Sequence, residues 1–334
     1  MVSSLTSPYV TATRLAALNA GAPVRVAAAL EAGISRGELR AAMAAGVITR
    51  VAHGVIAVTE DPHTAQTLLQ RCQALAARRP WLVFCHDTAA TLLHQPLLRA
   101  RGDVIRAYGK HAARIGQLLI HEGHIPDEHI VELHGIRMTS PLRTALDLAR
   151  ELPLPAALIP LDAALRSSIL TAATGCGLHD DLAVESESHQ FEVRERADQV
   201  LQTLRHLHGA RNARHALAVA SPLAESPAES ASRGHLLLAG IVPLGLQVRV
   251  VDAEGCERRL DFLLAPGLAG EVDGFVKYEG EDRRNAIREE KRRDLALQRA
   301  GVFAVHWSAE ESFWKPRRLI HVVRHALVTY RTSA

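Results

Sequence analysis

Three carboxylates placed inside short apolar runs constrain the fold of this 334-residue chain more than any other feature. Asp261 lies in RRLDFLL, at 258–264, and Glu271 and Asp273 lie in GEVDGFVKY, at 270–278. Runs of this length and composition predict buried strands, where an unpaired carboxylate costs several kcal/mol. We therefore expect the three acids to be paired, hydrogen-bonded or bound to a cation.

The spacing of these acids favours a cation site. Glu271 and Asp273 are two residues apart on one strand, so their side chains point to the same face. Asp261, on the strand before, joins them if the two strands pair. Carboxylate oxygens suit Mg²⁺ (or Mn²⁺) better than zinc, which prefers His and Cys ligands. Such an ion prepares a phosphate and a water for in-line attack, and Lys277 either assists that water or lies along the surface.

The region around these acids predicts a regular order of elements. A domain boundary falls near residues 220–227, where Pro222 and Pro227 interrupt the helical pattern. A helix, three strands, a basic helix, a fourth strand and a closing helix follow, at 227–239, 246–252, 257–264, 267–273, 284–300, 302–307 and 316–330. Lys291 and Arg293 on the basic helix are candidate DNA contacts, although a solvated helix with internal ion pairs has the same composition.

Residues 1–59 predict a small winged helix-turn-helix domain. Two short helices, at 23–32 and 36–45, are joined by a tight glycine turn, and a capping box begins the second. A β-hairpin follows at 47–58. The same parts also suit a small protein-interaction module, so the pattern alone leaves both interpretations open.

Four basic side chains of this domain are candidate DNA contacts. Arg36 and Arg40 lie on the second helix, which would enter a major groove. Arg50 and His53 lie on the hairpin, which would contact the DNA backbone. The four residues together predict duplex DNA as a partner.

The middle of the sequence shows no catalytic pattern. Residues 60–175 mix helical and β-rich pieces and predict an α/β domain, and residues 176–220 predict a helical connector. His121 and His124 lie in HEGH, which lacks the HExxH spacing of a zinc protease, so we interpret them as surface histidines.

Composition favours a soluble, intracellular protein. The four cysteines form no CxxC pair, which fits free thiols in a reducing cytoplasm. No stretch reaches the roughly 18 apolar residues of a membrane span. The net charge of +3 is too small to establish a nucleic-acid partner by itself. We therefore expect a cytoplasmic protein with no membrane partner.

The runs LDFLL, GEVDGFVKY and EEKRRDLALQRAGVFAVHW resemble the very-short-patch-repair-like branch of the PD-(D/E)XK endonuclease superfamily. The resemblance implies a restriction-endonuclease-like fold with catalytic acids on two strands and the first helix. Carried over position by position, these acids are Asp261, Glu271, Asp273 and Glu229, with Glu225 as an alternative to Glu229.

Further positions match or depart from this family. Gln247 matches a glutamine on the first strand and is a candidate DNA contact, and Lys277 matches a lysine after the Asp-Gly pair. Asp273 occupies the superfamily's lysine position, as is usual in this branch. His306 replaces an arginine expected near the end of the last strand, which affects one substrate contact.

Two other segments resemble actinobacterial proteins of the same architecture. The run ALEAGISRGELRAAMAAGVITRVAHGVIAV is similar to the winged helix at the N-terminus of AbiEi-type antitoxins. The run GIRMTSPLRTALDLAR is similar to the middle segment of those proteins and implies no particular chemistry.

We therefore predict an α/β (α+β) chain of four parts. A winged helix-turn-helix at 1–59 precedes a mixed α/β domain at 60–175, a helical connector at 176–220 and an αβββαβ endonuclease-like core at 221–334. The leading hypothesis is a Mg²⁺-dependent DNA endonuclease. The first alternative is a non-catalytic DNA-binding regulator of antitoxin type, with operator DNA and a toxin protein as partners. A protein-interaction module without a nucleic-acid role is the second.

Overall fold

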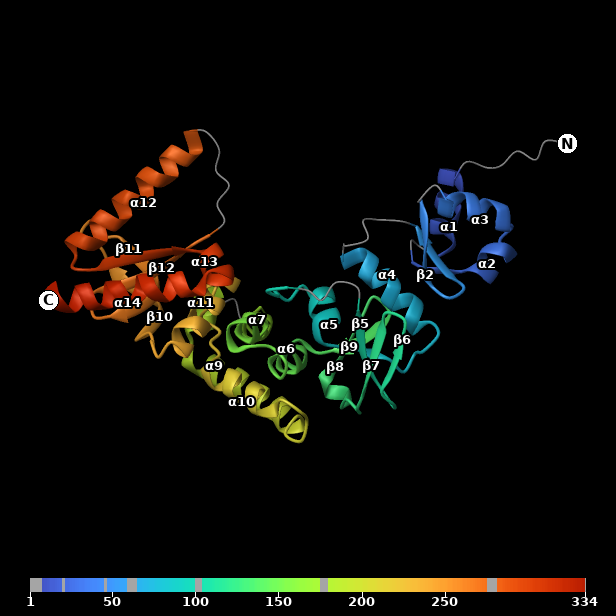
Figure 1. Ribbon diagram of the computed structural model, residues 1–334, viewed down its shortest axis with the longest axis horizontal. Helices are drawn as coiled ribbons and strands as arrows, with labels where there is room; N and C mark the ends of the chain where they lie inside the picture. Colours follow the sequence, from blue (N-terminus) through green and yellow to red (C-terminus); the bar gives the residue numbers. More distant parts are fainter. Residues whose placement is uncertain are drawn as a thin grey trace. The chain divides into compact units, whose positions relative to one another are not determined.

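The protein is built from helices and three β-sheets (Figure 1), and its computed structural model describes residues 8–19, 22–44, 47–58, 65–99, 104–174, 180–274 and 281–333. The chain folds into two compact units. The first unit contains residues 1–94 and 100–144, and the second contains residues 95–99 and 145–334. This division falls inside the segment predicted as one middle domain, because the helices after residue 144 pack with the C-terminal part of the chain.

The first unit begins with a small antiparallel sheet and its helices. The elements are α1 (Pro8–Leu18), β1 (Val24–Arg25), α2 (Val26–Glu31), α3 (Arg36–Ala44), β2 (Ile48–Ala52) and β3 (Val55–Val58). The strand order is β1-β3-β2, so the predicted hairpin is confirmed at β2 and β3. The predicted capping box is also confirmed: Ser35 N–H donates to Glu38 Oε2 at 2.7 Å, and Glu38 N–H donates to Ser35 Oγ at 3.2 Å.

The rest of the first unit is a six-stranded mixed sheet. Its elements are α4 (Ala65–Ala76), β4 (Val83–Phe84), α5 (His86–Leu92), β5 (Ile105–Gly109), β6 (Ala113–Ile115), β7 (Leu118–Glu122), β8 (Ile130–Leu133) and β9 (Ile136–Thr139). The strand order is β6-β7-β5-β4-β9-β8, and β5 with β7 and β4 with β9 are parallel pairs. Phe84, Leu118 and Met138 belong to its buried core. The short strand β4 therefore lies inside the sheet, and the residues that follow it begin α5 beside β5.

The second unit contains a group of helices around α7. They are α6 (Pro141–Ala149), which spans the division between the units, α7 (Leu154–Ala173), α8 (Asp180–Glu185), α9 (Glu187–Thr203), α10 (Ala210–Val219) and α11 (Pro227–Leu238). Among the described residues α7 alone is long and apolar enough to cross a membrane, and 61% of its most apolar window is buried inside the protein. This burial is the behaviour of a core helix in a soluble protein. A Cβ at Gly234 of α11 would lie 2.5 Å from Pro155 Cα, so glycine allows α11 to approach α7 closely.

A buried ion pair between Arg233 on α11 and Asp162 on α7 links these two helices. Asp162 also accepts a hydrogen bond from the Ser221 N–H at 2.8 Å. Replacing Arg233 by methionine should lower the free energy of unfolding, measured by urea denaturation, by about 3–5 kcal/mol, because a buried carboxylate loses its counter-ion. The double variant Arg233→Met with Asp162→Leu should lose less, since no unpaired charge remains. An equal or larger loss in the double variant would contradict this account.

The C-terminal sheet carries the acids singled out in the sequence. Its elements are β10 (Gly245–Val251), β11 (Glu257–Ala265), β12 (Leu268–Asp273), α12 (Glu281–Arg299), β13 (Phe303–Ser308), α13 (Ala309–Trp314) and α14 (Pro316–Ser333). The strand order is β10-β11-β12-β13, with the first three strands antiparallel and β12 parallel to β13. Together with α11 before them, these elements follow the predicted order, and α13 is added between β13 and the closing helix.

Candidate active site

The central acids lie where β11 and β12 stop pairing as an antiparallel ladder. The ladder runs to Phe262 and Gly270, after which β12 continues in parallel register with β13. At this point Asp261 Oδ2 accepts the backbone N–H of Val272 at 2.8 Å. The side chain of Asp261 therefore reaches across to β12 and is fixed beside Glu271.

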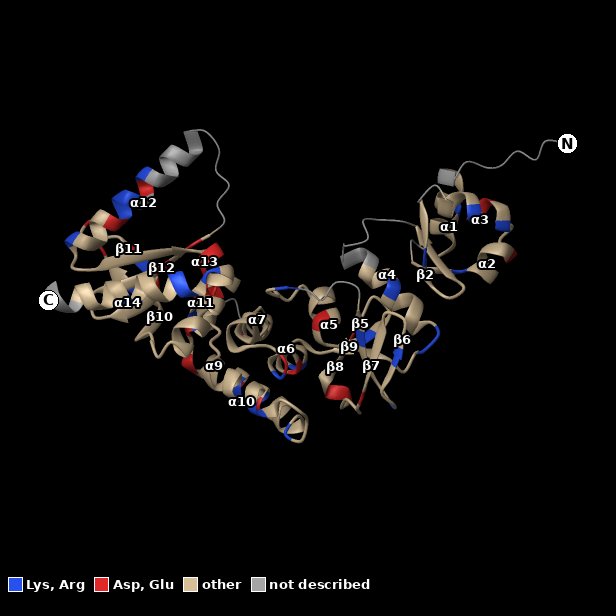
Figure 2. Ribbon diagram, viewed as in Figure 1, with Lys and Arg blue, Asp and Glu red and all other residues tan. Residues whose placement is uncertain are grey.

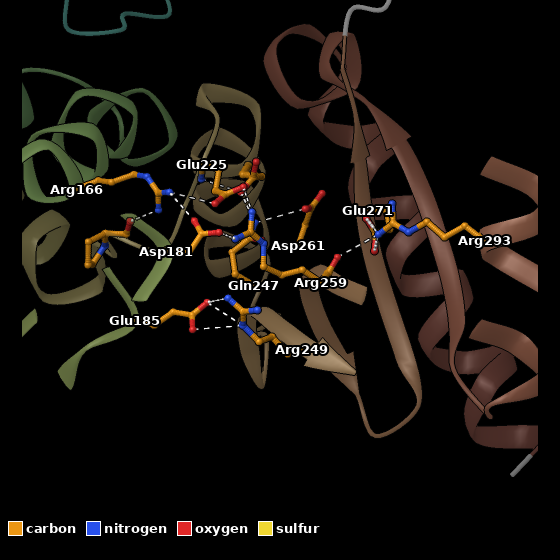
Figure 3. A network of polar contacts seen from close by, with 12 residues as sticks. Arg166, Asp181, Glu185, Glu225, Gln247, Arg249, Arg259, Asp261, Glu271 and Arg293 are labelled. Carbon is orange, nitrogen blue, oxygen red and sulfur yellow. Dashed lines mark hydrogen bonds and ion pairs between the residues drawn. The ribbon is translucent and has the colours of Figure 1, made fainter. Parts of the chain in front are cut away.

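An unusual backbone conformation brings Gln247 to Asp261. Gln247 lies between two paired positions of β10, where its φ of +52° is in the left-handed region that a glutamine rarely adopts. Its buried side chain donates from Nε2 to Glu229 Oε2 at 2.9 Å. The same Nε2 donates to Asp261 Oδ1 at 3.4 Å (Figure 3). Backbone strain of this kind is concentrated at functional sites. Gln247, predicted as a DNA contact, is here the bridge between two acids.

The first turn of α11 distinguishes Glu229 from Glu225. The side chain of Ser226 caps the helix by accepting the Glu229 N–H at 3.1 Å. Glu229 Oε2 accepts both the Glu225 N–H at 2.9 Å and the Gln247 amide. The carboxylate of Glu225 instead binds Arg166 and Arg259 (Figure 3). Of the two candidates, Glu229 is the one that the structure connects to Asp261.

Glu271 is paired with an arginine from α12. Arg293 Nη2 lies 3.3 Å from each carboxylate oxygen of Glu271 and 3.0 Å from the carbonyl oxygen of Arg259. The Glu271 side chain is 9% exposed and that of Arg293 is 35% exposed. Arg293, predicted as a DNA contact, thus supplies positive charge to the buried acid. Lys291 on the same helix is exposed, and α12 carries both basic and acidic positions in Figure 2.

Asp273 contacts a histidine rather than the other two acids of the strands. His306 of β13 is in register with Glu271, and its Nδ1 lies 3.2 Å from Asp273 Oδ1. Its Nε2 lies 3.3 Å from Asp294 Oδ2. The hydrogen bond to Asp273, followed by the nearby negative charges, raises the pKa of His306 to about 9. At neutral pH this position therefore carries an imidazolium cation, which partly replaces the charge of the arginine expected from the family pattern.

The buried acids hold their protons more strongly than ordinary carboxyl groups. Burial, together with the neighbouring charge of Asp261, raises the pKa of Glu271 to about 7. Burial also raises the pKa of Asp261, and burial with the charge of Asp261 raises that of Glu229. Each of these shifts has the same physical cause, since negative charge is gathered in a region with little water. A cation placed among them would lower all three pKa values.

The donor chemistry fits a hard divalent cation at Asp261 and Glu271. Both supply carboxylate oxygens, which Mg²⁺ and Mn²⁺ prefer, and Glu229 and Gln247 hold Asp261 in place. In the described part of the chain, however, Asp261, Glu271 and Asp273 do not come together as a group of three that could hold a metal ion. The structure thus places Asp261 beside Glu271, whereas Asp273 contacts His306. Lys277 lies outside the described residues.

The four candidate DNA contacts of the first unit are at least partly exposed. Arg36 and Arg40 lie on α3, and Arg40 Nε donates to the Arg36 carbonyl oxygen at 3.4 Å. Arg50 lies on β2 and His53 lies in the turn between β2 and β3. Their side chains are therefore accessible to a ligand.

The sequence analysis did not predict one group of potential metal ligands in the first unit. Cys85, His86 and His121 come together at the ends of neighbouring strands. The interpretation of His121 as a surface histidine is corrected, because parallel pairing of β5 with β7 places its ring beside Tyr108 and His86. His124 is exposed, as expected. The HEGH run was the sole sequence signal, since the spacing between Cys85 and His121 is too long to form a motif.

Comparison with known proteins adds no family assignment: the chain matches no protein-family model and no curated protein sequence.

Proposed function

We propose that the second unit is a metal-dependent DNA endonuclease domain of the PD-(D/E)XK type, with the αβββαβ core formed by α11, β10, β11, β12, α12 and β13. The observation that supports this most strongly is the connected series of Glu229, Gln247, Asp261 and Glu271. Three acids from a helix and two strands converge there with raised pKa values, and a strained glutamine joins two of them. A purely structural core would gain stability by replacing such a group with apolar side chains.

The side chains have distinct roles in this proposal. Asp261 and Glu271 would hold Mg²⁺ or Mn²⁺, and the bound ion would supply a more acidic water and a polarised phosphate. Gln247 and Glu229 position the Asp261 carboxylate, and Val272 N–H fixes its second oxygen. The protonated His306, whose two ring nitrogens face Asp273 and Asp294, offers positive charge for a phosphate oxygen. Lys277 is proposed to assist the attacking water, and Lys291 and Arg293 to contact the DNA backbone once Arg293 leaves Glu271.

The direct experiment incubates purified full-length protein with supercoiled plasmid. Conversion to nicked or linear DNA should require Mg²⁺ or Mn²⁺ and should stop when EDTA is added. Ca²⁺ in place of Mg²⁺ should support binding with little cleavage, and this arm separates recognition from chemistry. Plasmid that stays intact over a range of pH and both ions would contradict the proposed activity.

We further propose that the small sheet and helices of the first unit form a DNA-binding winged helix. In this arrangement α3 enters the major groove with Arg36 and Arg40, and the β2–β3 hairpin brings Arg50 and His53 to the phosphates. The accessibility of all four side chains supports this role. A cytoplasmic location is part of the proposal, because Cys72 and Cys256, among the described residues, carry free thiols, which suit a reducing compartment.

Removing the three arginines should weaken DNA binding and its dependence on salt. In the triple variant Arg36→Ala, Arg40→Ala and Arg50→Ala, the logarithm of the association constant should depend less steeply on the logarithm of salt concentration. The magnitude of this slope should decrease by up to about 2.7, or about 0.9 for each lost phosphate contact. Fluorescence anisotropy with a labelled duplex at several salt concentrations measures this.

A matched control removes the same charge elsewhere. Arg205, Arg211 and Arg214 are exposed and lie on or just before α10. Their triple alanine variant should keep the slope of the wild-type protein. If both triple variants lose the same slope, the winged-helix assignment is contradicted.

Two observations favour a second candidate function, a non-catalytic DNA-binding regulator of AbiEi antitoxin type. Arg293 already neutralises Glu271, and Asp273 is bound to His306 instead of completing a ligand set. A protein of this kind would bind operator DNA, and a toxin partner, without cutting DNA. Salt-dependent binding with intact plasmid in every metal would support this candidate over the endonuclease.

A further inference from the structure

A second group of metal-ligating side chains converges in the first unit. One ligand atom each from Cys85, His86 and His121 lies within 4.8 Å of the other two. Cys85 and His86 directly follow β4, and His121 lies on β7 in register with Tyr108 of β5. Because β4, β5 and β7 are neighbours in the sheet, the fold itself brings these three side chains together.

Two members of the cluster are buried and the third, His121, is half-buried, and the backbone holds its geometry. Cys85 and His86 are 0% and 1% exposed, and the Cys85 N–H donates to the Arg106 carbonyl oxygen at 3.0 Å. His86 Nδ1 lies 3.1 Å from Cys85 Sγ, and the His86 ring centroid lies 4.8 Å from that of His121. His86 has a φ of +54°, in the left-handed region. A buried histidine is rarely kept in this conformation unless its side chain position matters.

A buried carboxylate, that of Asp87, lies beside the cluster and Arg106. Arg106 Nε donates to His121 Nε2 at 3.1 Å, and Arg106 Nη1 lies 3.9 Å from Asp87 Oδ1. Within the described parts of the chain neither carboxylate oxygen of Asp87 accepts a hydrogen bond, although the residue is 6% exposed. A buried carboxylate without hydrogen bonds is costly. Asp87 can therefore accept hydrogen bonds from the guanidinium of Arg106 when His121 Nε2 binds another ligand.

We propose that Cys85, His86 and His121 form a zinc-binding site. One thiolate and two imidazoles are ligand types that Zn²⁺ prefers, and three protein ligands leave a fourth position for water. With Zn–S of about 2.3 Å and Zn–N of about 2.0–2.1 Å, tetrahedral ligand atoms lie roughly 3.3–3.6 Å apart. The present ligand atoms therefore need only small side-chain movements to reach these distances.

The charges around the site fit this proposal. Binding forms a sulfur–zinc bond at Cys85, breaks the S–H bond and releases one proton to the solvent. Arg106 moves from His121 Nε2 onto Asp87, which frees a lone pair on His121 and gives Asp87 its missing hydrogen bonds. The thiolate balances one of the two charges of the ion, and the Asp87 carboxylate balances that of Arg106. Asp87 is a positioning residue in this arrangement, because it acts through Arg106.

Cobalt titration of tag-free full-length protein tests the site without any enzyme assay. After removal of metal with a chelator, Co²⁺ should produce the visible bands of tetrahedral cobalt and a near-ultraviolet thiolate-to-cobalt band. Both should saturate at one equivalent and disappear when one equivalent of Zn²⁺ is added. Wild-type protein that gives neither band overturns the proposal, and this arm does not depend on any variant folding.

Variants assign the ligands. Cys85→Ser should abolish the near-ultraviolet band, and Asp87→Asn should weaken cobalt affinity about tenfold or more, as loss of an outer partner does. Cys256→Ser removes an exposed thiol and should leave the spectrum unchanged. A near-ultraviolet band that persists at full intensity in folded Cys85→Ser protein, or that is lost in Cys256→Ser protein, overturns the assignment.

Discussion

Replacing Asp261 by asparagine should reduce Mg²⁺-dependent plasmid cleavage by at least about a hundredfold, the effect of losing one group that stabilises developing charge. Asp261 is the residue most tightly held in the candidate site, with one oxygen on the Val272 N–H and the other facing Gln247. Asparagine keeps the shape but removes the charge that binds a cation. The rate of loss of supercoiled plasmid at saturating Mg²⁺ measures the effect.

A matched exchange controls for the chemistry of the substitution. Asp198 is exposed on α9 of the same unit, so Asp198→Asn should cleave at the wild-type rate. Metal binding gives a second readout. At a Mg²⁺ concentration about 100 times its dissociation constant, binding should stabilise the wild-type fold by about 2.7 kcal/mol, and this gain should vanish in Asp261→Asn. If the Asp261→Asn variant cleaved plasmid at the wild-type rate, the assignment of Asp261 to the active site would be contradicted.

The local features of the fold were predictable because they depend on short stretches of sequence. The β2–β3 hairpin, the capping box of α3 and the order of elements from α11 to β13 follow from turn residues, caps and alternating apolar positions. The brief strand β1 was not predicted, since Val24 and Arg25 have the pattern of a helix until β3 offers them an edge to pair with. Pairing between distant segments overrides local propensity in such cases.

The candidate site was predictable in its residue types and less so in its contacts. The acids of β11 and β12 stand out because charge in an apolar strand is costly. Nothing in the sequence indicated that Arg293 would bind Glu271 or that Asp273 would bind His306, because both contacts depend on how α12 and β13 lie against β12. The choice between Glu229 and Glu225 likewise depended on side-chain direction, since Glu229 lies in the first turn of α11 and Glu225 lies just before the helix.

Changing Glu271 to glutamine should make the metal-free protein more stable at pH 8 while it abolishes cleavage. The pKa of Glu271 is raised from 4.5 to about 7, so the folded state keeps its proton to higher pH than the unfolded state does. Stability is therefore lost as pH rises from about 4.5 to about 7, and the full cost is present above pH 7. A shift of this size corresponds to about 3 kcal/mol at about 1.4 kcal/mol for each pH unit.

At pH 8 the free energy of unfolding of Glu271→Gln should exceed that of the wild-type protein by about 1–3 kcal/mol. The gain is less than the full cost of the buried charge because the substitution also removes the charged partner of Arg293. It should shrink towards pH 5, where the folded wild-type protein holds the proton. Urea unfolding with EDTA, in a Trp81→Phe background, follows Trp307 and Trp314 of the second unit by fluorescence. Glu192→Gln, an exposed exchange on α9, should change stability little at either pH.

The pH dependence of this gain distinguishes a functional acid from a structural one. A structural Glu271 would stabilise the fold through Arg293, and the glutamine variant would then be less stable at pH 8. A functional Glu271 lowers the stability of the metal-free fold, and a divalent cation restores it by compensating the charge that Asp261 and Glu271 share. Addition of Mg²⁺ or Mn²⁺ at pH 8 should therefore bring the wild-type protein to or above the stability of Glu271→Gln, while the variant itself responds little. Equal responses of the two proteins to the ion would place the cation elsewhere.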